Sequence, residues 1–269
     1  MKKVFFSVLL LTALLFAVQA AGFAAANNKK DTPTPAFPQV STESVTREYR
    51  DEVTGKVYLT TSYARVELEN ADSFPALAKA LTEEHSRKHA AAAAKVAGEQ
   101  EKNALEYIRE SGSDSSFFSI ETASIRRSDA AIVSVQVDLD TWFGGVHPDR
   151  KYQGYNYDPA TGKQLLLKNA VKDLKAMEHL AAAALIRLNT EEERHFDSIF
   201  LKTLHNAFMQ ERKAKKPEQQ HIRWLMDDQG LTLLFGTYYF GSHASGPALL
   251  FIPFEGNESV FNEKYVKQN

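Results

Sequence analysis

The chain of 269 residues is 43% hydrophobic and 25% charged, which is typical of globular proteins and not of disordered or fibrous chains. A formal net charge of -2 argues against a general polyanion binder and gives nucleic-acid recognition no support. The absence of cysteine excludes disulfides, thiolate nucleophiles and cysteine metal ligands, and it also excludes a lipid-modified cysteine.

The first 26 residues have the pattern of a secretory signal peptide. Lys2 and Lys3 precede an apolar run at residues 4–18, which has the length of a signal hydrophobic region and is short for a membrane span. Small residues allow cleavage after Ala20 or after Ala26. An uncleaved membrane anchor is the alternative. We therefore expect an exported protein, periplasmic or secreted, with no cytoplasmic domain and no further membrane span.

Residues 27–40 contain three prolines and predict a flexible tether, with ordered structure beginning near Ser41. The β-branched and aromatic runs at 45–52 and 57–68 predict two strands, and Thr54-Gly55 between them predicts a hairpin.

A segment rich in Ala, Leu, Glu and Lys at residues 74–110 predicts a long helix. Ser73 is expected to cap its start, with Pro75 in the first turn. Gly98 is expected to break or kink this helix, and Gly112 to end it.

Residues 117–127 and 130–143 predict a second pair of strands. In the latter, apolar and polar residues alternate, so we expect one face to pack and the other to meet water. The packing face comprises Val133, Val135, Val137 and Leu139, and the water face comprises Ser134, Gln136, Asp138 and Asp140.

After a turn at 144–149, the rest of the chain predicts one short strand, two helices and three strands. The expected bounds are 152–157 for the strand, 169–188 and 191–213 for the helices, and 221–226, 231–239 and 248–254 for the last strands. The carboxylates of Glu191, Glu192 and Glu193 are expected at a helix N-terminus. The order of elements, without regular βαβ alternation, predicts an α+β fold with mostly antiparallel sheets. We expect an N-terminal module at 41–143 and a C-terminal module at 144–269.

Three motifs of the second half resemble one known family. They are FGGVHP at 143–148, YNYDPATGK at 155–163, and an aromatic stretch at 231–253 that includes FGTYY and ASGP. In this order they resemble the RsiV-type extracytoplasmic domain, domain of unknown function 3298, over residues 142–254. Residues 41–141 are similar to the module that usually precedes it, the PdaC-like domain of unknown function 4163.

The resemblance implies a function outside the cytoplasm. Such domains form the outer part of membrane-bound anti-sigma factors, where they can bind lysozyme, or they accompany peptidoglycan deacetylases or stand alone. This chain shows neither a sigma-binding segment nor room for a deacetylase domain. The resemblance therefore implies a stand-alone, non-enzymatic binding or sensing module at the cell envelope, with a lysozyme-like protein as partner. A glycan-binding module or a wall hydrolase using His147 and His243 is the alternative.

His147, in the GGVHPD turn, and His243, in the glycine-rich loop at 241–247, are the most site-like residues. They could meet if the strands before their loops are neighbours, and with Asp149 they would then suggest zinc. No local spacing supports a metal, so we expect no metal or cofactor. A tight structural turn is the simpler interpretation of His147.

Eight aromatic residues are expected to gather around these two loops, as binding surface or as core: Trp142, Phe143, Tyr152, Tyr155, Tyr157, Tyr238, Tyr239 and Phe240. The predicted binding residues are Trp142, Gly144, Gly145, His147, Pro148, Tyr155, Tyr157, Tyr238, Tyr239, His243 and Gly246.

The remaining candidates for catalysis have simpler interpretations, and we predict no catalytic residue. His85 and His89 share a helix face, but Ser86 stands where a zinc protease needs Glu, so both are expected on the helix surface. Ser242 and Ser245 lie in a sequence that does not match the G-x-S-x-G nucleophile motif. Asp138 and Asp140 are interpreted as solvated charges, not as a glycosidase pair.

Overall fold

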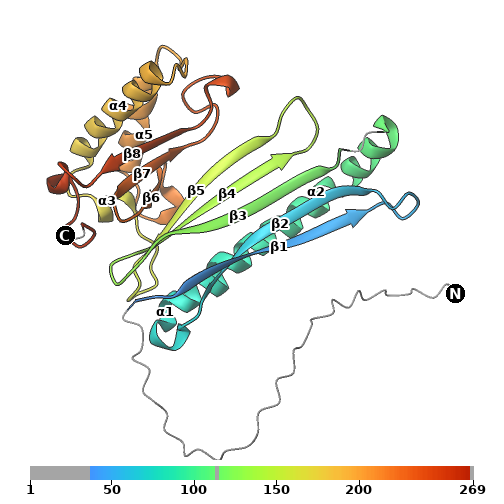
Figure 1. Ribbon diagram of the computed structural model, residues 1–269, viewed down its shortest axis with the longest axis horizontal. Coiled ribbons are helices and arrows are strands. Elements are labelled where there is room, and N and C mark those ends of the chain that lie inside the picture. Colours follow the sequence, from blue (N-terminus) through green and yellow to red (C-terminus); the bar gives the residue numbers. More distant parts are fainter. Residues whose placement is uncertain (1–36, 113–114, 267–269) are drawn as a thin grey trace, which may run out of the picture. The chain divides into compact units, whose positions relative to one another are not determined.

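The computed structural model describes residues 37–112 and 115–266. The expected signal peptide and most of the expected tether lie outside the described residues. Within them, strands and helices follow each other in the predicted order and form two largely antiparallel sheets with helices packed on them (Figure 1). The α+β class is confirmed.

The first sheet has five strands in sequence order: β1 (Val40–Arg50), β2 (Val57–Leu68), β3 (Phe117–Ser128), β4 (Val133–Trp142) and β5 (Asp149–Tyr157). All neighbours pair antiparallel except β2 and β3, which pair parallel through a short register that begins at Leu59 and Phe117. Parallel neighbours need a long crossover, and the predicted long helix supplies it.

This crossover comprises α1 (Pro75–Ala78), a π-helical segment (Lys79–Ser86) and α2 (Arg87–Ser111), and it runs along the five-stranded sheet (Figure 1). Leu77 and Leu81 are fully buried and belong to the same apolar cluster as Val66, Val135 and Val137 of the sheet. The helix ends at Gly112 in the left-handed conformation, as predicted.

Two expectations about this helix are wrong. Ser73 is not its cap, because Ser73 lies in a preceding 3₁₀ turn, where its N–H donates to the carbonyl of Asn70; Phe74 takes the cap position, and Pro75 is the first helical residue. Gly98 does not break α2, which is continuous from Arg87 to Ser111. No atom lies near the position that a side chain would take there.

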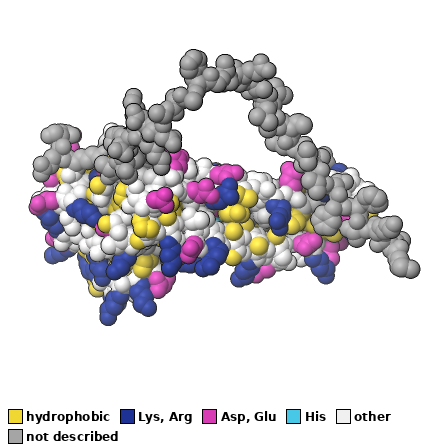
Figure 2. All heavy atoms as spheres, turned by 90° about the horizontal axis from the view of Figure 1, so that it is seen from below, with side chains coloured by type: hydrophobic (Ala, Val, Ile, Leu, Met, Phe, Trp, Pro, Cys, Tyr) yellow, Lys and Arg dark blue, Asp and Glu magenta, His cyan; other side chains and the backbone are white. Residues whose placement is uncertain are grey.

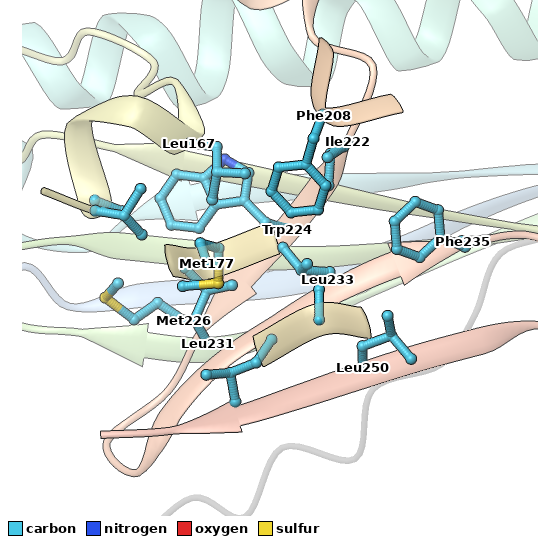
Figure 3. Packing of buried hydrophobic residues seen from close by; sticks show 14 of the residues in the cluster. Leu167, Met177, Phe208, Ile222, Trp224, Met226, Leu231, Leu233, Phe235 and Leu250 are labelled. Atoms are coloured by element: carbon cyan, nitrogen blue, oxygen red, sulfur yellow. The ribbon is translucent and has the colours of Figure 1, made fainter. Parts of the chain in front are cut away.

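The second sheet is built from β6 (Arg223–Met226), β7 (Gly230–Phe235) and β8 (Ala248–Pro253), all antiparallel. Helices α3 (Leu167–Ala170), α4 (Leu174–Glu191) and α5 (Phe200–Glu211) precede it. Figure 3 shows the core between these helices and the sheet, where Met177 of α4 and Phe208 of α5 pack around Trp224 and Leu233.

The acidic residues at 191–193 do not begin a helix, which corrects the prediction. Helix α4 continues to Glu191, and the pair between Arg187 and Glu191 lies at its C-terminus. Helix α5 then begins only at Phe200. The strand expected at 231–239 also ends earlier, at Phe235, because Tyr238 has a left-handed backbone with φ +68 that a strand does not tolerate.

The second sheet packs on the far face of β4 and β5, opposite the α2 side. Asn156 Nδ2 donates to the carbonyl of Trp224 (2.8 Å), and Ser134 Oγ accepts from the N–H of Met226 (3.0 Å). Ser134 is therefore fully buried, so the expectation that its face meets water is wrong at that end of β4. The module boundary expected near residue 143 falls in the turn between β4 and β5, which are neighbours in one sheet.

Short 3₁₀ helices occur at Ala71–Ser73, Pro217–Gln219, His243–Ser245 and Glu258–Val260. No helix among the described residues has both the length and the apolarity for a membrane crossing. On the face shown in Figure 2, acidic and basic side chains are interspersed with smaller apolar areas, consistent with a net charge near zero.

Candidate functional site

Two loops far apart in the sequence meet at one surface, which we call the loop site: residues 144–148 after β4 and residues 238–246 after β7. The rings of His147 and His243 stack there, with centroids 3.5 Å apart and planes at 21°. The Tyr238 ring lies 5.5 Å from His243. The two histidines therefore meet as anticipated, although β4 and β7 belong to different sheets and it is the packing between the sheets that brings them together.

Backbone geometry holds both loops in place. Gly144 and Gly145 have φ of +88° and +104°, values that other residues rarely adopt, and the carbonyl of Gly145 accepts a hydrogen bond from Trp142 Nε1 (3.2 Å). In the second loop, Ser245 Oγ donates to the carbonyl of His195 (3.1 Å). Gly246 has φ of +67°, a backbone conformation that favours glycine.

The loop site exposes apolar and aromatic surface. Val146 is 98% exposed and Tyr238 is 56% exposed. Tyr239 is less exposed because its ring packs on Phe235 and Phe240, and burial raises the pKa of its phenol.

At the loop site, the described residues give a metal centre no support. Its stacked imidazoles are not joined by a third ligand, and in residues 37–112 and 115–266 no group of three or more His, Asp or Glu residues is arranged to hold a metal. The postulated third ligand, Asp149, lies beside Lys151 (3.8 Å). The Ser245 hydroxyl donates to the His195 carbonyl and is buried.

The two aspartates of β4 are likewise occupied. Asp140 Oδ2 accepts from Arg150 Nη2 (2.7 Å), which raises the pKa of that guanidinium, and Asp138 accepts from Gln136 (2.8 Å). Asp140 and Arg150 line an open groove of about 620 Å³. Pro148 of the loop site also lines this groove.

The expectation that eight aromatic residues gather around the two loops is wrong for Tyr155 and Tyr157. Trp142 does lie beneath the first loop, in contact with Phe117 and with Tyr107 of α2. Tyr155 and Tyr157 do not belong to the loop site, because they lie at the other end of β5, on the face that packs against the helix.

These tyrosines line a second cavity of about 300 Å³, which we call the imidazole pocket. Its walls are formed by Glu84, His85, Lys88, His89, Ala92, Tyr155, Tyr157, Gly162 and Gln164. The two histidine rings stack at 4.2 Å, and the Tyr155 ring meets both of them edge-on.

The prediction that His85 and His89 lie on the helix surface is wrong. His85 is 3% exposed, and the His89 side chain is 12% exposed. His89 Nδ1 donates to the Glu121 carboxylate of β3 (2.6 Å), which in turn accepts from the N–H of Ala64 (2.8 Å). The sequence did contain a signal, because His85 continues the buried row of Leu77 and Leu81 at four-residue spacing.

Burial shifts the pKa values of three side chains in this pocket, those of His85, Tyr155 and Tyr157. Desolvation, followed by the charges of His89 and Lys88, lowers the pKa of His85 to about 3, so its imidazole is neutral at pH 7. Desolvation also raises the pKa of Tyr155 to about 12, and it raises that of Tyr157. Tyr157 OH lies 3.3 Å from His85 Nδ1, whereas His85 Nε2 is shut off from solvent and has no hydrogen-bond partner within the described residues.

Comparison with known proteins gives a match at the level of structure. No family model matches the chain, and no curated protein matches it. A crystal structure of a DUF3298 family protein from Pseudomonas aeruginosa PAO1 is similar with a TM-score of 0.53 and 14% identity, over 86% of this chain and 98% of that one. A member of the same family from Bacteroides fragilis NCTC 9343 has a TM-score of 0.55 and 13% identity, over 84% of this chain and 94% of that one. The chain therefore has the fold of DUF3298 family proteins.

Proposed function

We propose that this chain is an exported, non-enzymatic binding or sensing module of the cell envelope, and that the loop site is its recognition surface. The observation that supports this most is the stacking of His147 on His243, which fixes two loops side by side. Together they present Val146 and Tyr238 to solvent on one prearranged surface. Exposed aromatic residues on loops held by a rigid scaffold are typical of binding surfaces.

The proposed partner is a protein, with a wall-active enzyme such as lysozyme as the first candidate. The RsiV-type motifs support this partner. The fold shared with DUF3298 proteins supports the resemblance on which the motifs rest, and the matched region extends well beyond residues 142–254. The PdaC-like assignment of the upstream half and the removal of residues 1–26 on export belong to the same proposal. The apolar, nearly uncharged character of the loop site suits a protein partner better than a polyanion.

Calorimetric titration of the mature chain with lysozyme, and separately with soluble peptidoglycan fragments, tests the proposal. Val146→Asp and Tyr238→Ala should each weaken binding about 30-fold, since a central anchor residue contributes ~2 kcal/mol or more. Val53→Asp is the matched control, because Val53 is also a highly exposed valine in a hairpin turn but lies between β1 and β2.

Three outcomes would contradict the proposal. Equal weakening by Val53→Asp would show a nonspecific effect. Binding of glycan fragments that Tyr238→Ala weakens, without binding of lysozyme, would favour the glycan-binding alternative. Fractionation that finds the full-length polypeptide inside the cell would overturn the proposed export.

A further inference from the structure

The imidazole pocket offers hydrogen-bonding side chains that the rest of the described chain does not use. Glu84, Lys88, Tyr155 and Gln164 line the cavity, and their side chains make no hydrogen bond or ion pair with the described part of the chain. These four side chains can therefore bond to a small molecule that replaces water in the cavity.

The walls of the pocket are rigid. Tyr155 and Tyr157 are held by the β4–β5 pairing, and His89 is fixed by the Glu121 carboxylate (2.6 Å). Another part of the wall is the turn at Gly162, whose backbone is so close to the start of α1 that a side chain would lie 2.2 Å from the Ala76 carbonyl oxygen. A ligand therefore meets a prearranged surface and costs little ordering of the protein.

The mixture of donors and acceptors indicates what this ligand is. Lys88 donates and Glu84 accepts, with opposite charges that leave the rim near neutral. Tyr155 OH and the Gln164 amide can do both. A carboxylate ligand could satisfy only the donors and would face Glu84. A hydroxyl group both donates and accepts, so several hydroxyls on one neutral ring could satisfy all of these groups.

We propose that the imidazole pocket binds a small neutral saccharide, a monosaccharide or disaccharide, independently of the loop site. The cavity of about 300 Å³ is at the small end of ligand-binding pockets and would otherwise hold ~10 water molecules. The rings of Tyr155 and Tyr157 provide its apolar wall, and the polar groups at its rim fix the orientation of the hydroxyls.

Nitrogen-detected NMR of the histidine side chains in the full chain tests this. Titration with glucose and with N-acetylglucosamine at millimolar concentration should shift the imidazole resonances of His85 and His89, whereas sodium acetate should not. Tyr155→Phe, which keeps the ring, and Gln164→Leu should each weaken sugar binding about fivefold, the loss expected for one hydrogen bond. Tyr152→Phe is the control on the opposite face of β5, and sugar affinity should be unchanged.

The proposal is overturned if neither sugar shifts these resonances, if acetate shifts them more than the sugars do, or if Tyr152→Phe weakens binding as much as Tyr155→Phe. Thermal unfolding of each variant shows whether it folds. None of these measurements involves Val146, Tyr238 or lysozyme, so failure here is distinct from failure of the loop-site function.

Discussion

The two sheets approach each other closely at Gly154, so the addition of one methyl group there should strongly lower the free energy of unfolding. Gly154 of β5 lies directly against β6, and a Cβ at this position would be 1.9 Å from the carbonyl oxygen of Trp224 and 2.8 Å from its carbon. Both are backbone atoms, so no rotamer change can relieve the clash. Gly154→Ala must therefore push β6 away from β5.

The cost follows from what that movement breaks. Overpacking of a close contact costs about 1–3 kcal/mol. Separation also strains the hydrogen bonds from Asn156 Nδ2 to the Trp224 carbonyl and from the Met226 N–H to Ser134 Oγ, and each buried polar group left without a partner costs about 1–3 kcal/mol. We expect a loss of about 4 kcal/mol in the free energy of unfolding, or roughly 8–16 °C in Tm for a chain of this size.

The assay is urea and thermal unfolding followed by circular dichroism, with Gly98→Ala as the control. Gly98 is in α2, and no atom lies within 4 Å of the position that its Cβ would take, so the same substitution should stabilise the protein by about 1 kcal/mol through helix propensity. A Gly154→Ala protein within about 1 kcal/mol of the wild type would refute the inferred contact between the sheets.

Two further predictions concern buried side chains that can carry a charge. Because burial, and then the charge of His89, lowers the pKa of His85 from 6.5 to about 3, the unfolded chain binds a proton in this pH window that the folded chain does not. The free energy of unfolding should therefore fall by about 1 kcal/mol per pH unit below pH 6.5, and urea titrations at pH 7 and pH 5 should show a smaller fall in His85→Gln. The Arg127 side chain, 3% exposed, donates to the Tyr265 carbonyl (2.7 Å) and pairs with Asp129, so Arg127→Met should cost about 3 kcal/mol and speed proteolysis of the C-terminal segment.

Much of the fold could be predicted from the sequence, because local residue patterns indicate its strands, turns and helix ends. The period-two alternation in β2 and β4 and the turn residues at Gly55 and Asp158 mark strands and their connections without reference to distant residues. The same holds for the end of α2 at Gly112, where a left-handed backbone is needed. The parallel pairing of β2 with β3 has no local signal, but it follows from the helix between them.

The errors arise where a distant element decides the environment. Ser134 fits the polar face of an amphipathic strand, yet it is buried because β6, almost a hundred residues later, packs on that face. The meeting of His147 with His243 depends on the same packing, and no local pattern encodes it. The prediction for Glu191 is wrong because α4 continues to this residue, so its carboxylate lies at a helix C-terminus and not at the start of a new helix.

The two histidine pairs show how the same residue type acquires different roles from its surroundings. At the loop site, His147 is exposed and stacks on a partially exposed ring, so its edge remains available to a partner in solution. In the imidazole pocket, the helix and the sheet bury His85, which keeps its imidazole neutral at pH 7 and leaves its Nε2 without a partner among the described residues. The cavity beside this imidazole has a volume of about 300 Å³, so it admits only small molecules. Large partners are consequently expected at the first pair and small polar ligands at the second.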